Sequence, residues 1–192
     1  MRFPARISRS LTIAIAAVLS CCSNTTTYDE AIEKNRNNFE DPQQLGDAIF
    51  LVEMKSVNLL HLELLQIAAQ SGYASELVNL GKEEIGSFKT IAQDLTEVAR
   101  GEEVRLPTKM SGDHETRLAG IRETPRQDID RAIITELRKL NEAALGQLTL
   151  MATEGSDPDV RAFAARKIGT LRVHLARVID VEDGLLTTVK GE

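Results

Sequence analysis

The amino-acid sequence predicts an all-α protein, a four-helix bundle built from two helical hairpins that a long crossover joins. Three observations support this prediction. Apolar side chains recur at helical spacing from residue 41 onward. A shift of 83 residues brings two parts of the chain into register without a gap, so that Asn58 falls on Asn141. The segment between these parts, residues 101–126, is rich in glycine and proline and too long for a tight turn.

The N-terminus has the pattern of a secretory signal. Three arginines precede an uncharged apolar stretch, Leu11 to Leu19. This stretch is too short for a membrane-spanning helix, which needs ~20 apolar residues. The sequence "VLSC" that ends at Cys21 resembles the bacterial lipobox, whose cysteine becomes the first residue of the mature chain and carries acyl chains such as palmitate. We therefore expect residues 1–20 to be a lipoprotein signal peptide and Cys21 to be the lipid attachment site.

Two other interpretations of the cysteines stay open. Cleavage one residue later would make Cys22 the lipid site, and an ordinary signal would leave a vicinal cysteine pair or a free thiol. Neither Cys22 nor Ser23 is the aspartate that resembles an inner-membrane retention signal in enteric bacteria. We therefore expect a lipid-anchored protein of the bacterial cell envelope, at the outer membrane and facing the periplasm. Several acyl chains anchor firmly because each buried methylene contributes ~0.8 kcal/mol.

The charge balance limits the possible partners. Removing residues 1–20 takes away three arginines and no acid, so 23 basic residues become 20 against 29 acidic ones, a net charge of −9. An acidic chain favours neither nucleic acid nor anionic lipid as a partner. We expect residues 21–40 to be a polar tether and residues 182–192 a C-terminal tail. Membrane contact would then come through the lipid alone, and an envelope protein is a possible partner.

The first predicted hairpin begins at Asp41 and Pro42, which offer an N-cap and a proline in the first turn. Its first helix ends at Gly72, and the second helix follows directly. The inward positions of the first helix are spaced 4, 3, 4, 3 and 4 residues apart: Phe50, Met54, Val57, His61, Leu64 and Ala68. The inward positions of the second helix are Leu77, Gly81, Ile85, Phe88, Leu95 and Val98.

The crossover is expected to hold one short helical piece near residues 113–121. Thr124, Pro125 and Gln127 then resemble a capping box that starts the third helix with proline in its first turn. The sequence "GSDPDV" from Gly155 ends the third helix and caps the fourth. The inward positions of the third helix are Ile134, Leu137, Asn141, Ala144, Leu148 and Met151. Those of the fourth helix are Val160, Ala164, Leu171, His174 and Val178.

The long crossover predicts a ferritin-like helix order, in which the second and third helices run parallel. A crossover of this length can run along the whole bundle, so we predict this order for a domain at residues 41–181. With a rise of ~1.5 Å per residue, His61 and His174 lie about 24 and 25 Å along the first and fourth helices. Because these two helices are parallel in a ferritin-like order, the two histidines are expected at one level.

Four stretches resemble a bacterial family called domain of unknown function 4142, over residues ~45–181. They are "DAIFLVEM" from Asp47, "ARGEEVRLP" from Ala99, "DIDRAI" from Asp128 and "DPDVRAFAARKIGTLRVHL" from Asp157. The resemblance implies a ferritin-like fold and agrees with export; the biochemical activity of the family is not settled.

The same resemblance implies four polar positions in the middle of the bundle. A family glutamate falls on His61, and family histidines fall on Phe88 (or Ser87), Asn141 and His174. Only His174 retains the family residue, so the resemblance does not carry the family's site over to this chain.

The candidate chemistry centres on His61 and His174. A di-iron site would need Glu-x-x-His motifs, and no histidine of the chain follows a glutamate at that spacing. Two interpretations stay open: a metal or haem site that uses these histidines with Asn141 and Glu84, or two buried histidines whose partners are Asn141, Glu84, Glu63 or water.

No catalytic motif is found, and the body of the chain has no cysteine. We expect a non-enzymatic envelope lipoprotein that binds a protein partner or ligand and needs no cofactor. The alternative is a metal- or haem-binding ferritin relative that uses His61 and His174.

Overall fold

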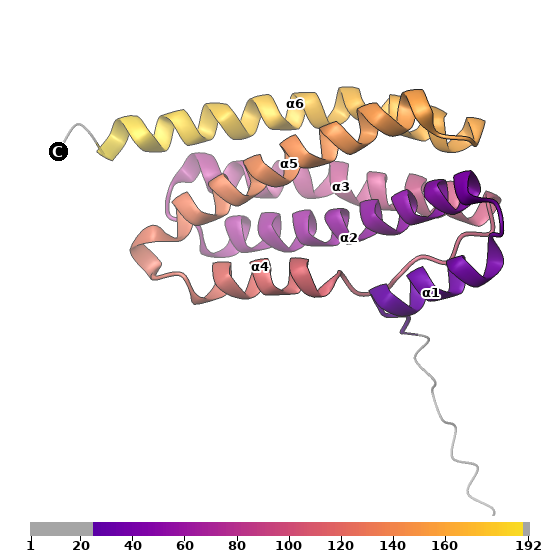
Figure 1. The fold of residues 1–192 in the computed structure, drawn as a ribbon. Helices are drawn as coiled ribbons and strands as arrows, with labels where there is room; N and C mark the ends of the chain where they lie inside the picture. Colours follow the sequence, from indigo (N-terminus) through magenta and orange to yellow (C-terminus); the bar gives the residue numbers. More distant parts are fainter. Residues whose placement is uncertain (1–24, 190–192) are drawn as a thin grey trace, which may run out of the picture.

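The computed structural model describes residues 25–189, and in this range the protein is all-helical, without strands. Four long helices carry most of the chain, and Figure 1 shows them side by side along one axis. The prediction of lipid attachment at Cys21 lies outside the described residues. The elements are α1 (Tyr28–Asn38), α2 (Pro42–Ser71), α3 (Ser75–Gly101), α4 (Gly112–Glu123), the 3₁₀ turn η1 (Arg126–Asp128), α5 (Ile129–Glu154) and α6 (Pro158–Val189).

The four long helices pack as two hairpins. Helix α2 lies against α3 and α5 lies against α6; between the hairpins, α2 contacts α5 and α3 contacts α6. Asp47, near the start of α2, bonds to Ser156 at the end of α5, so these two helices are antiparallel. Glu84 in the first half of α3 pairs with Arg177 of α6, and Asp94 farther along α3 pairs with Lys167 earlier in α6, so these two helices are antiparallel too. It follows that α3 and α5 run in the same direction, and the segment between them spans the bundle (Figure 1).

The apolar stripes that predict the four long helices form one core. Each fully buried leucine, isoleucine or phenylalanine contributes about 1.5–3 kcal/mol to folding. These side chains come from all four long helices: Leu60 and Leu64 of α2, Leu77 and Leu95 of α3, Ile133 and Leu137 of α5, and Phe163 and Val178 of α6. The core therefore lies along the bundle axis, as the helical spacing predicts.

Reciprocal hydrogen bonds confirm the 83-residue repeat. The carboxylate of Asp47 accepts from Ser156 N and Oγ (3.2 and 2.7 Å) and from Asp157 N (2.7 Å). The carboxylate of Asp130 accepts from Tyr73 N (3.0 and 3.1 Å) and from Ala74 N (2.7 Å). Adding 83 to positions 47, 73 and 74 gives 130, 156 and 157. Each hairpin thus supplies an aspartate that satisfies the backbone N–H groups at the turn of the other hairpin.

The glycines at the two hairpin turns are also equivalent under this shift. Gly72 N donates to Ala68 O (3.1 Å), and Gly155 N donates to Met151 O (3.0 Å). A Cβ atom added at either glycine would lie 2.7 or 2.8 Å from the same carbonyl oxygen, closer than van der Waals contact allows. Glycine is therefore required by close backbone approach, and both turns have the same local geometry.

Residues 25–40 are not the polar tether that the sequence predicts. They include α1, which begins with a capping box between Thr27 and Glu30 and packs on α2 through the buried Ala31. The side chain of Asn35 bonds to both the N–H and the C=O of Arg105, at 2.8 and 2.9 Å. Because α1 buries only Ala31 and Asn35, its sequence has almost no apolar periodicity. This is why the sequence predicts a tether here.

Two boundaries also differ from the predictions. Thr124 forms no capping box: its hydroxyl donates back to Gly120 O (2.9 Å), and the turn η1 precedes α5. Helix α6 continues to Val189, so most of the predicted C-terminal tail is helical. The short helix expected in the crossover is α4, whose N-cap is Ser111. Among the described residues, no helix is long and apolar enough to cross a membrane.

Candidate functional site

The four long helices bring one residue each to a common level in the middle of the bundle. His61 of α2 stacks on Phe88 of α3, with ring centroids 4.3 Å apart. His174 of α6 meets Phe88 edge-on at 4.8 Å and lies 6.1 Å from His61. Asn141 comes from α5 and is fully buried. His61 is 0% and His174 1% exposed, so this level of the core is closed to solvent.

The hydrogen bond of His61 fixes its tautomer. Its Nδ1 lies 3.1 Å from Val57 O, and a carbonyl oxygen can only accept, so Nδ1 carries the proton. The Nε2 atom then holds a lone pair, and it has no hydrogen-bond partner among the described residues. Burial, followed by the nearby His174, lowers the pKa of His61 to about 3, against the opposing effects of Val57 O and the Asn141 side chain. His61 is therefore a neutral imidazole that presents an unused acceptor to the core.

His174 has a carboxylate beside the corresponding nitrogen. Its Nδ1 lies 3.3 Å from Glu84 Oε2, within ion-pair distance but without the alignment of a hydrogen bond. Glu84 is itself buried and also pairs with Arg177. Burial lowers the pKa of His174, against the opposing effect of Glu84. With the Nδ1 proton directed toward the carboxylate, the lone pair of Nε2, which has no partner among the described residues either, faces the core.

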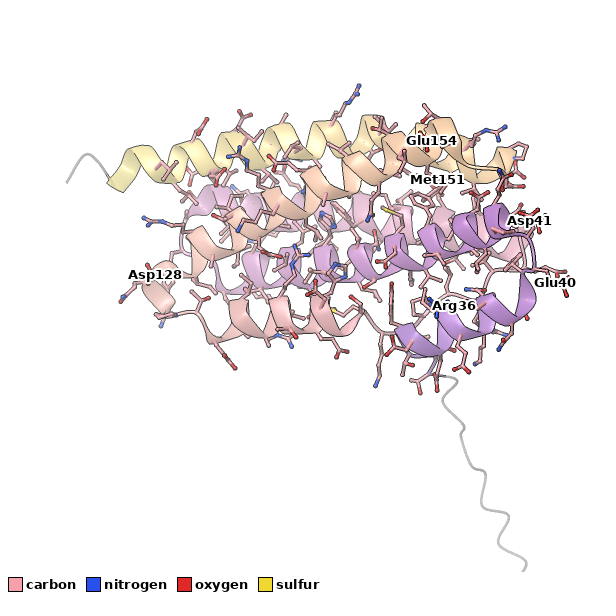
Figure 2. All side chains as sticks on the ribbon, in the orientation of Figure 1. Arg36, Glu40, Asp41, Asp128, Met151 and Glu154 are labelled. Atoms are coloured by element: carbon pink, nitrogen blue, oxygen red, sulfur yellow. The ribbon has the colours of Figure 1, made fainter. Side chains whose placement is uncertain are left out.

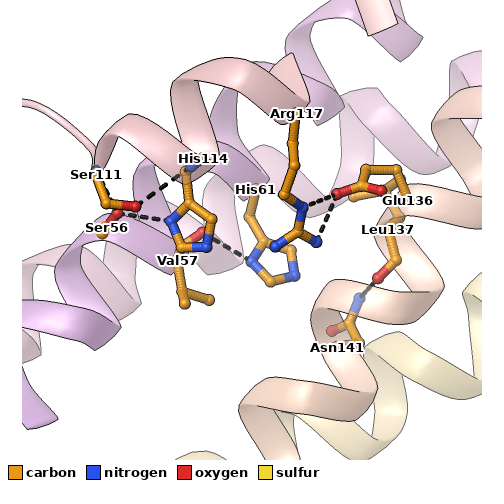
Figure 3. A network of polar contacts seen from close by, with 9 residues as sticks. All are labelled: Ser56, Val57, His61, Ser111, His114, Arg117, Glu136, Leu137 and Asn141. Atoms are coloured by element: carbon orange, nitrogen blue, oxygen red, sulfur yellow. Dashed lines mark hydrogen bonds and ion pairs between the residues drawn. The ribbon is translucent and has the colours of Figure 1, made fainter. Parts of the chain in front are cut away.

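Asn141 adds a third unused acceptor. Its amide nitrogen donates to Leu137 O at 2.7 Å, which leaves Oδ1 as the free end, and this oxygen has no partner in the described part of the chain. Figure 3 shows the side chains of Asn141 and His61 pointing toward one another from α5 and α2. Asn58, three residues before His61, is buried, and neither of its side-chain polar atoms has a partner within residues 25–189. A buried polar group left unsatisfied costs about 1–3 kcal/mol, so the acceptors His61 Nε2, His174 Nε2 and Asn141 Oδ1 favour an occupant that donates hydrogen bonds or carries positive charge.

We call His61, Glu84, Asn141 and His174 the polar layer. All four are candidate residues predicted from the sequence, and the structure places them together. Their arrangement resembles the surroundings of metal-binding histidines, where one ring nitrogen donates to a carbonyl or carboxylate and the other is left for the ion. Glu63, considered as a histidine partner, instead pairs with Arg122 of α4 at 2.7 Å. Of the two positions on which a family histidine could fall, Phe88 and Ser87, it is Phe88 that contacts the histidine rings.

Helix α4 covers the polar layer on the side of α2 and α5. His114 of α4 meets the buried Ser56 of α2, with Nδ1 and Oγ 2.6 Å apart, and Arg117 pairs with Glu136 of α5 at 2.5 Å (Figure 3). The three histidines of the chain thus lie in or above this layer. No sequence pattern predicts the Ser56–His114 contact; the local signal is a histidine that follows the N-cap Ser111 of a short helix.

A second cluster is acidic and lies at the end of the bundle where α1 meets α2. Figure 2 shows Glu40 and Asp41 there. Glu102, Asp157 and Asp159 have carboxylate oxygens within 4.8 Å of one another. A cavity of about 260 Å³ adjoins them. Burial and the neighbouring acids raise the pKa of Glu102. One Asp157 oxygen already accepts from the first N–H groups of α6, so we interpret this cluster mainly as helix capping.

The comparisons with known proteins place the chain in a family without a settled activity. No curated protein and no solved structure matches it. The family model described as "Domain of unknown function (DUF4142)" matches residues 34–181, from the middle of α1 to near the end of α6. This range includes the whole polar layer and α4. The chain therefore belongs to the DUF4142 family.

Proposed function

We propose that this chain is a non-enzymatic, lipid-anchored protein of the bacterial envelope that binds a ligand in its polar layer. The anchor rests on the signal-like N-terminus and on Cys21 in "VLSC". The observation that carries the binding role is the set of acceptors without a partner in the described chain, His61 Nε2, His174 Nε2 and Asn141 Oδ1, in the closed centre of the bundle. A closed site of this kind suits retention of a ligand better than turnover of a substrate.

The fold that we propose for the binding domain is a ferritin-like four-helix bundle of α2, α3, α5 and α6. Its support is the direction of the helices: α3 and α5 run the same way, and residues 102–128 connect them along the bundle. In this order the first and last helices of the bundle are parallel. Positions at equal distance from their starts then meet, which is how His61 and His174 come to one level.

The ligand that we propose is a divalent transition-metal ion bound by Nε2 of both histidines. Imidazole nitrogen suits zinc, copper, nickel and iron. Val57 O accepts from Nδ1 of His61 in the manner that orients metal-binding histidines, and a Glu84 carboxylate oxygen lies 3.3 Å from Nδ1 of His174. Asn141 Oδ1 would supply an oxygen ligand. The ion would satisfy the buried acceptors and strengthen the bond between the two hairpins, because its ligands come from both.

Haem does not fit the same residues. A porphyrin bound by both histidines would have to pass between the two imidazole rings. Phe88 is in ring contact with each of them, at 4.3 and 4.8 Å. The side chain of Phe88 therefore occupies space that the macrocycle would need.

Two measurements on protein purified from its own envelope test the proposal. Elemental analysis should find a transition metal in the wild type and less than a tenth of it in the His61→Leu/His174→Leu variant. If the wild type contains no metal, the metal site is ruled out. If native mass spectrometry then finds an unassigned small molecule bound to the protein, the binding role stands without a metal. Mass spectrometry of the N-terminal peptide should find acyl chains on Cys21. An unacylated mature protein would contradict the anchor.

A further inference from the structure

Helix α4 is built as a separate cover over the polar layer. Two connecting segments, residues 102–111 and 124–128, join it to α3 and α5, and it contacts α2 and α5 but neither α3 nor α6 strongly. The side chains of Leu118 and Ile121, on the inner face of α4, are buried. Since the α2–α5 side of the layer lies under this helix (Figure 3), moving α4 as a unit would open a route to His61 and Asn141 without separating the hairpins.

A buried hydrogen bond fastens this cover. Ser56 Oγ accepts from Ser111 N at 2.8 Å, so its own hydrogen is free to point at His114 Nδ1, 2.6 Å away. Ser56 is fully buried and His114 is 7% exposed. We assign the hydroxyl as the donor in this contact, which leaves Nδ1 unprotonated and the histidine neutral. Arg122 with Glu63 and Arg117 with Glu136 also join α4 to α2 and α5, as ion pairs with partly exposed side chains.

The groups around His114 come from three helices. Glu53 of α2, Asp113 and Arg117 of α4, and Glu136 of α5 act on it, and His61 lies within electrostatic reach. Burial has the largest effect and lowers the pKa of His114, with Arg117 in the same direction, against the three carboxylates. A protonated His114 is thus disfavoured in the closed position, where its Nδ1 would no longer accept the hydrogen bond that we assign to the serine hydroxyl.

We propose that α4 is a pH-dependent cover of the polar layer, held closed by the Ser56–His114 hydrogen bond and released when His114 takes up a proton. This inference rests on the proposed function, since the layer is the site that the cover opens. An uncovered histidine has an ordinary pKa of about 6.5. If the closed state takes up no proton, the ratio of open to closed α4 rises about tenfold between pH 7.5 and 5.5.

Thiol labelling measures this opening without any metal. The full chain carries Cys21→Ser and Cys22→Ser, which remove its only two cysteines. Leu118→Cys then reports on the buried face of α4, and Ala119→Cys, at the exposed neighbouring position, is the matched control. The ratio of their labelling rates cancels the pH dependence of thiol chemistry. Ile121→Cys is a second buried reporter if Leu118→Cys fails to fold, and Leu95→Cys in the core of α3 reports on global unfolding.

The labelling rate of Leu118→Cys relative to that of Ala119→Cys should rise about tenfold from pH 7.5 to 5.5, while Leu95→Cys stays protected. With His114→Asn added, the ratio should stay constant, because the amide oxygen can accept from Ser56 and does not titrate. A ratio that is flat in the parent chain, a rise that survives His114→Asn, or labelling at position 95 that rises in parallel would each overturn the proposal. Failure of metal binding would leave these labelling results unchanged, so the two proposals fail separately.

Discussion

The two hairpins share their ends and differ in their interiors. Asp47 and Asp130 hold the turns in the same way. At mid-bundle the shift of 83 residues places His61 on Ala144, Phe88 on Leu171 and Ile91 on His174. The repeated aspartates hold the hairpin turns, whereas His61, Glu84 and His174 of the polar layer stand at positions where the repeat is broken; Asn141 keeps its equivalent, Asn58. The difference teaches that the turn contacts and most of the candidate site are encoded by separate residues.

The ion pairs between α3 and α6 also depart from the repeat. Glu84 of α3 pairs with Arg177 of α6, and Asp94 of α3 pairs with Lys167 of α6. Adding 83 to positions 84 and 94 gives 167 and 177, so the two pairs are equivalent and their charges are reversed. Two copies of one hairpin would set like charges against each other in this docking. Each hairpin therefore matches the other one better than a copy of itself.

The largest expected effect comes from breaking one of the shared ends. Asp47→Ala strands the backbone N–H groups of Ser156 and Asp157 and should lower the free energy of unfolding by about 3 kcal/mol. Asp130→Ala, the equivalent change at a less buried carboxylate, should cost about 1–2 kcal/mol. Urea unfolding monitored by circular dichroism gives both values. Equal losses at the two sites, or none at Asp47, would show that the aspartates do not hold the turns as described.

The second largest expected effect is on the free energy of unfolding at acid pH. His61, His114 and His174 have pKa values lowered by burial, so below pH 6.5 the unfolded chain binds more protons than the folded one. Stability is therefore full above pH 6.5 and falls as the pH drops toward 3, by up to about 1.4 kcal/mol per pH unit for each histidine. His61→Leu/His174→Leu should remove most of this slope in metal-free protein. An unchanged slope between pH 6.5 and 4.5 would contradict the assignment of buried neutral imidazoles.

The smallest effect sharpens the comparison of the ion pairs. Lys167→Glu alone should cost about 1 kcal/mol, and Asp94→Lys added to it should restore most of the loss, since these side chains meet mainly each other. The equivalent reversal, Glu84→Lys with Arg177→Glu, should recover less, because His174 also faces position 84 and Arg177 also pairs with Glu83. A double-mutant cycle on each pair separates the two outcomes. Full recovery at Glu84 would mean that neither of these additional contacts contributes.

The sequence predicts the long helices well because each of them buries an apolar stripe over many turns. The repeat also places the two turn glycines, Gly72 and Gly155, at equivalent positions of the hairpins. Helix α1 escapes prediction because it buries only Ala31 and Asn35, too few for a periodic signal. Its position depends on Thr26 and Asn35 bonding to the backbone of the crossover, which no local pattern encodes.

The polar layer is predicted in part for a physical reason. His61, Asn141 and His174 fall on inward positions of helical stripes, where polar residues stand out against their neighbours. Ser56 and His114 do not stand out, because their contact joins a helix to a crossover segment 58 positions away. Nor does the sequence reveal the tautomer of His61, since that depends on which backbone carbonyl its ring reaches. Contacts that depend on how the helices dock leave no periodic pattern, so the sequence does not predict them.

The most direct test of the polar layer as a binding site is the thermal unfolding midpoint with and without zinc. A bound ligand stabilises the fold by about 2.7 kcal/mol at a hundredfold excess over Kd, which raises Tm by several degrees in a chain of this size. The wild type should gain this shift, Asp130→Ala should keep it, and His61→Leu/His174→Leu should lose it. Equal responses of the wild type and the double variant, or no response in either, would contradict a metal site in the polar layer.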